Sequence, residues 1–416
     1  MSEHISTTTL DSFILSDIAH VEMGQSPDSR YVVEDPFQGL AFLQGNAEFG
    51  AVYPEPKFGC LRPAKRCKAN DVLISVRAPV GAINVADRDY CIGRGLAAIR
   101  AQGIKPSLLG EVVARQSTAL RRVAQGTTFE AINKKDLLTL KLSLPPKTDW
   151  SQLAEILDTL DTAIHETEAI IAKLKAVKQG LLHDLLTRGV DANGELRPPQ
   201  AEAPHLYKES PLGWIPKEWD AVKLSKSIGL ISGQHIEAEL CNSVGKGVPY
   251  FTGPSDFLGA GTIVTQYTNR PQIMCDEADI LLTVKGSGCG KVAISGVKAC
   301  ISRQLMAIKV PARALQYWFA VFQSLQEHFN RMATGGNIPG ISRAQILDLL
   351  VAIPNVIDEM EAIGNRIHSI NARLDSELLT LEKLKLEKAG LIADLLTGRV
   401  RVTQLLAEAA QQPGSA

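Results

Sequence analysis

An eighteen-residue segment near the middle of the chain, residues 173–190, returns near its end as residues 383–400. Aligned without gaps, the two copies are identical at 11 of 18 positions. A repeat of this length indicates that one structural unit has been duplicated, and it constrains the fold more than any single motif.

Long amphipathic helices are predicted to run through both copies. The pattern covers about residues 151–187 and 358–397, and each helix would be a rod of roughly 55 Å at ~1.5 Å per residue. Such a rod needs a partner for its apolar seam, and the other copy is the nearest candidate. If a pseudo-twofold axis relates the copies, the two helices run antiparallel. The alternative, two unrelated amphipathic helices, leaves the identity between the copies unexplained. The seven-residue spacing comes from Leu153, Leu157, Leu160, Ile164, Ile171, Leu174 and Leu181, and from Ile363, Ile367, Ile370, Leu374, Leu381, Leu384, Leu391 and Leu395.

Length and composition exclude several classes of protein. A chain of 416 residues is too long for one core, so two or three domains are expected. The formal net charge of −1 offers no general attraction to nucleic acid, so any basic surface must be local. The 7 cysteines form no Cys-x-x-Cys pair, which favours reduced thiols over a metal site. Without an export signal or a long apolar run, the protein is expected to be cytoplasmic, with no membrane contact.

The segments outside the long helices read as globular units of strands and turns. Short apolar runs punctuated by Gly, Pro and Asn extend from about residue 10 to 144. They predict a hairpin of residues 71–77 with 82–85, a helix over 104–125 and a strand over 140–144. Asn133 is a candidate N-cap for a short helix. Residues 189–204 have the composition of an exposed turn and linker.

The second globular unit repeats the first at a displacement of 208 to 210 residues. Gly24-Gln25 returns as Gly233-Gln234, and the hairpin strand of residues 71–77 returns as residues 279–285. Whole loops differ between the matched positions. The predicted fold class is therefore α/β (α+β), with two similar globular units and two long antiparallel coiled-coil helices, arranged as a pseudo-twofold repeat carrying two different surfaces.

No catalytic or metal-binding motif is found in the sequence. Residues 286–291 superficially resemble a phosphate-binding loop, but the glycine spacing is one residue short and Val292 replaces the required Ser or Thr. This segment matches residues 78–81, which predicts a glycine-rich hairpin turn. The histidines show no ligand spacing, and His235 is more simply a surface residue. We therefore predict no catalytic residue, and no metal or cofactor held by this chain.

Cationic and amide side chains recur at matched loop positions where they could contact DNA. Arg bonds guanine and Gln bonds adenine bidentately in the major groove, while Lys or a glycine-rich loop can hold phosphate. The alternative is a framework role, which repetition favours, because residues that distinguish two targets should differ between the units. The candidates in the first unit are Gln25, Ser26, Gln44, Asn46, Arg77, Arg94 and Thr128; those in the second are Gln234, His235, Thr252, Lys285, Ser287, Lys291, Arg303 and Asn337.

In these features the chain resembles the specificity subunit of type I restriction-modification systems. The resemblance is carried by the half repeats, by the run from Asp71 to Gly81, by Gly213-Trp214-Ile215-Pro216 through Trp219, and by the doubled Gly-Leu-(Leu/Ile)-x-Asp-Leu-Leu-Thr endings. It covers about residues 10–402. Two departures stand out: the first unit lacks a Gly-x-Ile-Pro opening, and Cys91-Ile92-Gly93-Arg94-Gly95 differs from Cys300-Ile301-Ser302-Arg303-Gln304.

The resemblance implies a division of the chain and a set of partners. It implies target-recognition domains at residues 1–148 and 213–356, long helices at 149–190 and 357–398, a linker at 191–212 and a tail at 399–416. Each domain would bind one half of a split, asymmetric site in double-stranded DNA. Two modification (methyltransferase) subunits would dock on the helices and supply S-adenosylmethionine chemistry. Restriction/translocase subunits would bring ATP and Mg²⁺ chemistry.

Two readings from other classes stay open at this point. One is a complete DNA-modifying enzyme with unrecognised motifs, which activity of the isolated chain with S-adenosylmethionine or magnesium would support. The other is a coiled-coil assembly scaffold that contacts only proteins, which failure of the reconstituted complex to select any DNA sequence would favour.

The predicted rod suggests a ruler for the two half-sites, because successive major-groove faces of DNA repeat every ~34–36 Å. Adding four residues, roughly 6 Å of helix, to both helices at matched positions should lengthen the preferred spacer. The expected change is about one or two base pairs at ~3.4 Å each. Methylation mapping measures the spacer, and an unchanged spacer would contradict the hypothesis.

Overall fold

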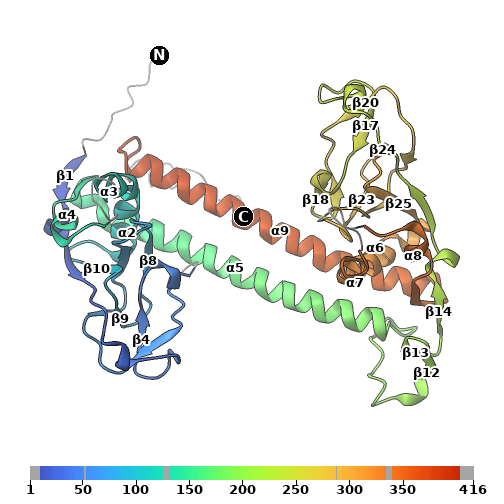
Figure 1. Ribbon diagram of the computed structural model, residues 1–416, viewed down its shortest axis with the longest axis horizontal. Helices are drawn as coiled ribbons and strands as arrows, with labels where there is room; N and C mark the ends of the chain where they lie inside the picture. Colours follow the sequence, from blue (N-terminus) through green and yellow to red (C-terminus); the bar gives the residue numbers. More distant parts are fainter. Residues whose placement is uncertain (1–9, 51–52, 125–130, 287, 334–339, 403–416) are drawn as a thin grey trace, which may run out of the picture. The chain divides into compact units, whose positions relative to one another are not determined.

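The computed structural model describes residues 10–50, 53–124, 131–286, 288–333 and 340–402. The chain forms two compact units: Met1–Thr167 with Leu381–Ala416, and Glu168–Thr380. Helices α5 (Trp150–Thr187) and α9 (Ile357–Leu395) each contribute residues to both units (Figure 1). The helices predicted over 151–187 and 358–397 are therefore confirmed to within two residues.

Among its described residues, unit 1 contains three sheets and four short α-helices besides its parts of α5 and α9. The sheet orders are β2-β10-β7-β8, β3-β5-β4-β9-β6 and β1-β11. Its helices are α1 (Leu15–Ile18), α2 (Pro106–Arg115), α3 (Ser117–Ala124) and α4 (Lys134–Leu138). Its strands are β1 (Asp11–Ile14), β2 (Ala19–Met23), β3 (Val32–Val33), β4 (Leu40–Leu43), β5 (Phe58–Cys60), β6 (Arg66–Cys67), β7 (Val72–Ser75), β8 (Ile83–Val85), β9 (Tyr90–Ile92), β10 (Leu96–Ala101) and β11 (Lys141–Leu144).

Strand β7 of unit 1 is buried on both faces, which explains its continuous apolar run. Val72 and Ile74 pack into one core with α2 and α3, while Leu73 packs into a second core with β4 and β9. Alternate side chains of a strand point to opposite faces, so the four-stranded sheet is the middle of three layers. The helices lie on one side of this sheet and the five-stranded sheet on the other (Figure 1).

Two local predictions for unit 1 are confirmed by the structure, and a third is corrected. Strands β7 and β8 form the predicted antiparallel hairpin. The Asn133 side chain caps α4 by accepting hydrogen bonds from the amides of Lys135 and Asp136. The helix expected over 104–125 is instead two helices: α2 ends at Arg115 with Gln116 as its C-cap, and α3 begins at Ser117.

Unit 2 repeats the strand order of unit 1. Its sheets run β15-β25-β22-β23, β16-β20-β17-β24-β21 and β14-β26, with two additional hairpins, β12-β13 and β18-β19. Its shorter helices are α6 (Leu315–Ser324), α7 (Gln326–Met332) and α8 (Arg343–Leu347). Its strands are β12 (Tyr207–Ser210), β13 (Gly213–Pro216), β14 (Trp219–Lys223), β15 (Gly229–Ser232), β16 (Cys241–Asn242), β17 (Val248–Phe251), β18 (Phe257–Leu258), β19 (Gly261–Thr262), β20 (Tyr267–Thr268), β21 (Met274–Cys275), β22 (Ile280–Thr283), β23 (Val292–Ile294), β24 (Ala299–Ile301), β25 (Leu305–Lys309) and β26 (Leu350–Pro354).

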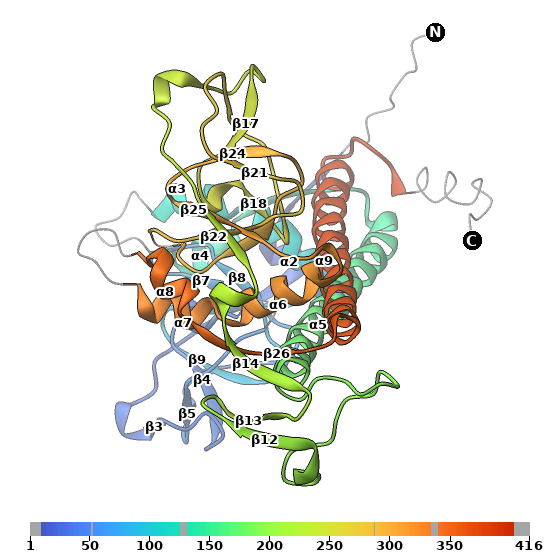
Figure 2. The same ribbon diagram turned by 90° about the vertical axis from the view of Figure 1, so that its right-hand side faces the viewer.

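The layering of unit 2 also repeats that of unit 1. Ile280 and Leu282 pack in the core that contains α6, and Leu281 packs in the core that contains β17 and β24. Helix α6 lies beside the first turns of α9 (Figure 2), where a Cβ on Gly364 would approach the Tyr317 amide nitrogen to 2.6 Å. The glycine therefore permits close packing of these two helices.

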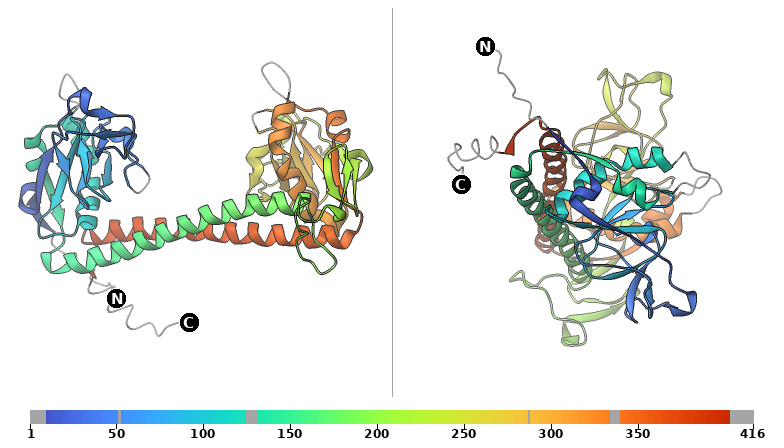
Figure 3. Two further views of the ribbon diagram at one scale, coloured as in Figure 1. Left: turned by 90° about the horizontal axis from the view of Figure 1, so that it is seen from below. Right: turned by 90° about the vertical axis from the view of Figure 1, so that its left-hand side faces the viewer.

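The long helices pair antiparallel through an apolar seam with alternating three- and four-residue spacing. In unit 1 the start of α5 lies beside the end of α9 (Figure 3), and Leu153 and Leu157 share a core with Leu395. In unit 2 the end of α5 meets the start of α9, and Leu185 shares a core with Ile363. Both units are therefore closed by parts of both helices, as the pseudo-twofold reading predicts.

Two lysines at matched positions interrupt this seam. Lys388 Nζ lies 2.6 Å from an Asp161 carboxylate oxygen and 2.7 Å from one of Glu111 in unit 1. Lys178 occupies the corresponding position in unit 2, where burial lowers its pKa and Asp375 opposes that shift. Polar residues inside an apolar seam favour one register, because other registers leave the charge unpaired.

The segment predicted to be an exposed turn and linker is exposed only in part. The turn forms as expected, with the Gly194 amide donating to the Asp191 carbonyl at 2.9 Å. Arg197 is instead buried, because its guanidinium donates to carboxylate oxygens of Glu359 at 2.5 Å and Glu218 at 2.6 Å. The contact with Glu359 holds the segment against the first turn of α9. The prediction of an exposed linker is therefore wrong at Arg197.

Candidate nucleic-acid interface

Backbone hydrogen bonds join four strand ends of unit 1 into one loop cluster. The Gly24 amide donates to the Leu96 carbonyl and the Gln25 amide to the Ile92 carbonyl, both at 2.9 Å. The Gly93 amide donates to the Leu43 carbonyl at 2.8 Å. The loops after β2, β4 and β9 are thus held together although they are far apart in sequence.

The same connections recur in unit 2. The Gly233 amide donates to the Leu305 carbonyl at 3.1 Å, and the Gln234 amide donates to the Ile301 carbonyl at 2.9 Å. The Ser302 amide donates to the Phe251 carbonyl at 2.9 Å. The matched residues therefore build one framework twice.

The repeated glycines are explained by how closely the loops approach each other. A Cβ on Gly24 would lie 2.1 Å from the Gly93 carbonyl oxygen, and one on Gly233 would lie 2.2 Å from the Ser302 carbonyl oxygen. Both distances are well inside van der Waals contact, so only glycine fits without a shift of the backbone.

The sequence difference between residues 91–95 of unit 1 and residues 300–304 of unit 2 also has a structural reason. In unit 1 a Cβ on Gly95 would meet the Gln44 carbonyl oxygen at 2.6 Å. In unit 2 the Ser302 hydroxyl donates to the Thr252 carbonyl oxygen at 2.5 Å and accepts from the Gln304 amide at 3.1 Å. A side-chain hydrogen bond thus replaces a close backbone approach.

The candidate DNA-contacting residues of unit 1 lie on and beside this loop cluster. Gln25, Gln44 and Arg94 are exposed on the loops that follow β2, β4 and β9. Ser26 is exposed and its hydroxyl accepts from the Arg94 amide at 3.4 Å, which links two of the loops. Of the remaining candidates, Asn46 follows β4 and is half-buried, and Arg77 follows β7 and is exposed. Thr128 lies outside the described residues.

The candidates of unit 2 divide into exposed side chains and framework residues. Gln234, Lys285 and Arg303 are exposed at positions that match Gln25, Arg77 and Arg94. His235 and Lys291 are also exposed, while Ser287 and Asn337 lie outside the described residues.

Thr252 belongs to the framework of unit 2. Its hydroxyl donates to an Asp256 carboxylate oxygen at 2.9 Å, and its amide reaches the same oxygen at 2.6 Å. These bonds direct the hydroxyl inward, so its predicted role in contacting DNA gains no support from the geometry.

Strands β22 and β23 form an antiparallel hairpin, as predicted, and the described residues 286 and 288–291 lie in the turn between them. Gly286 and Gly290 have φ values of +86° and +85°, the left-handed region that favours glycine. The Gly290 amide donates to the Thr283 carbonyl at 2.8 Å, and the Gly81 amide donates to the Ser75 carbonyl at 3.0 Å in the matched turn of unit 1. A phosphate-binding loop followed by a helix is therefore not formed here.

Residues 57–68 of unit 1, which we call the basic segment, were not predicted to be functional from the sequence. The segment contains five cations and no acidic residue: Lys57, Arg62, Lys65, Arg66 and Lys68. A count of charge in short windows would have found it, because the net charge of the whole chain conceals it.

The titratable groups of the described residues do not form a reactive centre. Burial raises the pKa of the Cys67 and Cys91 thiols to about 12, so neither supplies a thiolate nucleophile at neutral pH. Across the described ranges, no three His, Cys, Asp or Glu side chains are grouped so that they could hold a metal ion. Nor does any helix there combine the length and apolar character needed to cross a bilayer.

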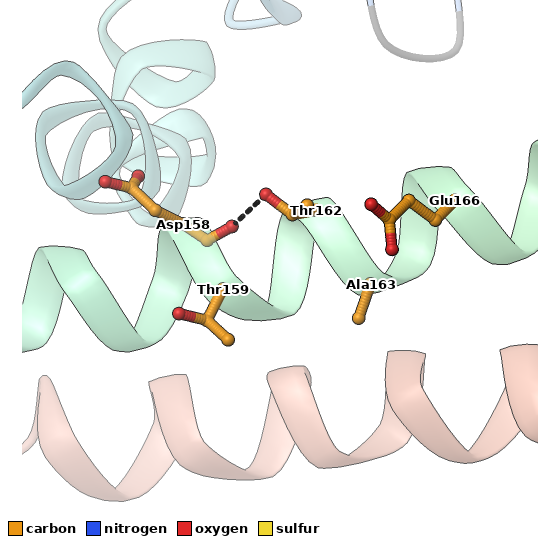
Figure 4. A pocket seen from close by; sticks show the side chains of 5 residues that line it. All are labelled: Asp158, Thr159, Thr162, Ala163 and Glu166. Carbon is orange, nitrogen blue, oxygen red and sulfur yellow. Dashed lines mark hydrogen bonds between the residues drawn. The ribbon is translucent and has the colours of Figure 1, made fainter.

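An open hollow on α5 does not resemble a catalytic pocket either. It is lined by Asp158, Thr159, Thr162, Ala163 and Glu166 (Figure 4). The Thr162 hydroxyl donates to the Asp158 backbone carbonyl at 2.7 Å, so it is already engaged within the helix. Small-molecule sites are usually enclosed clefts or cavities, and this hollow is open to solvent.

Comparisons with known proteins agree on one family. A sequence model described as the type I restriction modification DNA specificity domain matches residues 11–176. A putative type I restriction enzyme MjaX specificity subunit of Methanocaldococcus jannaschii is 28% identical over 293 residues, which is 69% of this chain and 66% of that protein. The MjaVIII specificity subunit of the same organism is 24% identical over 306 residues, 69% of this chain and 68% of that one. The chain thus spans about two thirds of the length of these relatives.

Solved structures share the fold over almost the entire chain. The type I restriction-modification S subunit from M. genitalium has a TM-score of 0.68 at 15% identity, covering 95% of this chain and 98% of that one. A structure described as the basis of complex assembly and conformational transition of the type I system has a TM-score of 0.51 at 16% identity, covering 94% and 98%. At these identities the likeness shows the fold.

The duplicated α/β units, the two long helices and the exposed polar loops at matched strand ends are consistent with the DNA specificity domain that the family model describes. The family model matches unit 1, and the internal repeat extends the same framework to unit 2. Residues 11–176 thus match the DNA specificity domain of type I restriction-modification systems, and the chain is similar in sequence and in fold to specificity subunits of these systems.

The loop cluster predicts a clear difference between two glycines of unit 1. Gly24→Ala should lower the free energy of unfolding by about 1–3 kcal/mol, because its Cβ would overlap the backbone. Gly45→Ala is the matched control: it lies in the same cluster, has an extended backbone and has nothing within 4 Å of the added Cβ. Chemical denaturation of the full chain measures both, and equal effects of the two variants would contradict the role assigned to Gly24.

Proposed function

We propose that residues 1–148 and 213–356 are two target-recognition domains, each reading one half of a bipartite, asymmetric site in double-stranded DNA. The helices at 149–190 and 357–398 hold the two domains, residues 191–212 connect them along the chain, and residues 399–416 form a tail. Similarity to specificity subunits supports the class of function, and the repeated framework with different loops supports the bipartite site.

One observation carries the proposal: the two units share a backbone framework but differ in the loops built upon it. The amides of Gln25 and Gln234 make equivalent hydrogen bonds at 2.9 Å. In contrast, the exposed turn after β8 carries Asp87, Arg88 and Asp89, whereas the matched exposed turn after β23 carries Gly296, Val297 and Lys298. Two similar readers with different surfaces suit two unlike half-sites better than a palindrome.

Exposed side chains at matched strand ends are suited to major-groove contacts. Arg94 and Arg303 follow β9 and β24 and could bond guanine bidentately, while Gln25 and Gln234 could bond adenine. Phosphate contacts would fix the orientation of each unit without reading sequence.

The remaining components of the proposal concern partners. We infer that two modification subunits and the restriction/translocase subunits assemble with this chain, and that they bind S-adenosylmethionine, ATP and Mg²⁺. This places methyl transfer and cleavage on the partners, the chemistry for which this sequence carries no motif. Partner subunits that contact DNA phosphates would also compensate for the near-neutral charge of this chain.

Methylome sequencing of a host with and without this gene, in the presence of the modification subunit, tests the proposal. We expect a methylated motif of two unlike half-sites with a fixed spacer, which disappears when the gene is removed. A single uninterrupted motif, or methylation that does not depend on the gene, would refute the bipartite reading.

A matched pair of variants assigns the half-sites in the same experiment. Arg94→Ala should relax one half and Arg303→Ala the other, each by about 1–3 kcal/mol of discrimination at a contacted base pair. If both variants relax the same half, the assignment of one half-site to each unit is wrong.

A further inference from the structure

The basic segment gives the two units unequal charge at the same place in the fold. Residues 57–68 carry five cations and no acidic residue, a net charge of +5. The matched residues 265–276 carry Arg270 and Asp276 as their charged residues, so +1 and −1 give zero. The match is topological as well as sequential, because β5 and β6 occupy the positions of β20 and β21 in sheets of the same order.

The pairing of single residues confirms this correspondence. Cys67 pairs with Tyr90 on β9, and Cys275 pairs with Ala299 on β24, both antiparallel. The charge difference therefore lies on one structural position rather than on an insertion.

The basic segment borders the loop cluster of unit 1. Arg66 pairs with Cys91, and the Ile92 amide donates to the Lys65 carbonyl at 3.1 Å. The carbonyl of Ile92 in turn accepts from the Gln25 amide at 2.9 Å. The cations of the segment thus begin one strand away from the loops that carry Gln25 and Arg94.

The side chains of the segment are available to an anionic ligand. Lys57, Arg66 and Lys68 are exposed. Within the described ranges the ion pair formed by the segment is that of Lys65 with Glu22, at 2.5 Å. This contact holds the pKa of the Glu22 carboxyl below its usual range and neutralises Lys65.

Arg62 is held in place before any ligand binds. Its guanidinium lies 4.9 Å from the centroid of the Tyr31 ring and donates to the Tyr31 hydroxyl oxygen at 3.1 Å. Arg30 lies 5.1 Å from the same ring, but its charge is paired with Asp28 at 2.8 Å. A guanidinium that is already ordered loses less side-chain entropy on binding.

We propose that the basic segment binds the phosphodiester backbone of DNA beside the half-site read by unit 1, and that the matched segment of unit 2 makes no equivalent contact. The inference rests on the proposed function. A chain with a net charge of −1 has no general attraction to DNA, so a local excess of cations is where phosphate affinity concentrates. Unit 1 then supplies more of the sequence-independent affinity and unit 2 less.

The test uses the reconstituted methyltransferase complex and a duplex that contains its own methylation motif. The variant Lys57→Gln/Arg66→Gln/Lys68→Gln removes three exposed cations of the segment. The control Lys226→Gln/Lys246→Gln/Arg270→Gln removes three exposed cations of unit 2. Binding is measured over a series of salt concentrations.

The first variant should flatten the slope of log K against log salt by about 2.7, which is ~0.9 for each DNA phosphate that the segment no longer neutralises. The control should change the slope by less than ~0.9, the value for a single phosphate. The methylated motif should stay the same for both, because phosphate contacts carry no sequence information. An unchanged slope, an equal effect of the control, or an altered motif would overturn the proposal.

A charge-conserving variant, Arg66→Lys/Lys68→Arg, separates loss of charge from loss of folding and should keep the wild-type slope. If its slope flattens as well, the segment acts through its structure and the inference fails. The proposed function would fail in a different way: the wild-type complex would then show no preference for the motif over a scrambled duplex.

Discussion

The antiparallel contact between α5 and α9 is the constraint on which the structure depends. Leu153 and Leu157 of α5 share a core with Leu395 of α9 in unit 1, while Leu185 and Ile363 share the core of unit 2. Each fully buried side chain of this size contributes about 1.5–3 kcal/mol. Because the beginning of one helix and the end of the other close each core, neither unit has a complete core without both helices. The sequence repeated at the ends of α5 and α9 therefore supplies equivalent core contacts in the two units.

The loop clusters of the two units are also built on the same framework. Gly24 and Gly233 stand where a Cβ would overlap a neighbouring carbonyl oxygen, and the amides that follow them make equal hydrogen bonds. Residues that the two units share are thus mainly those that build the backbone. The surfaces that we propose to contact DNA are free to differ, as the charge of residues 57–68 against 265–276 illustrates. Under the proposed function, the duplication yields two recognition domains with different surfaces on one fold.

The features that the sequence predicts well are those with a local or periodic cause. Seven-residue spacing predicted α5 and α9, the apolar run from Val72 predicted the β7-β8 hairpin, and Asn133 predicted the start of α4. Contacts between residues that are far apart in the sequence could not be predicted from it. Arg197 reads as part of a polar linker until Glu359, 162 residues later, is placed beside it.

The residues of the candidate interface also divide into those that the sequence could predict and those that it could not. The matched glycines and the residues that follow them could be found from the repeat, because duplication aligns them. Thr252 could not be assigned to the framework, since its bond to Asp256 depends on the turn between them. Lys178 and Lys388 were missed because a search for apolar spacing passes over charged residues in the seam. The basic segment was missed because the net charge of the whole chain, −1, conceals a local excess of cations.

DNA recognition is expected to lie in the globular units and not in the helices. Exchanging the globular part of one unit for that of the other tests this directly. Residues 224–349 would be replaced by a second copy of residues 15–140. The cuts lie at matched hydrogen bonds, from the Leu15 amide to the Leu140 carbonyl at 3.0 Å and from the Leu224 amide to the Leu349 carbonyl at 2.9 Å. Methylome sequencing of the resulting complex should show a motif in which the half-site of unit 1 occurs twice. Retention of the original two unlike halves would contradict the account.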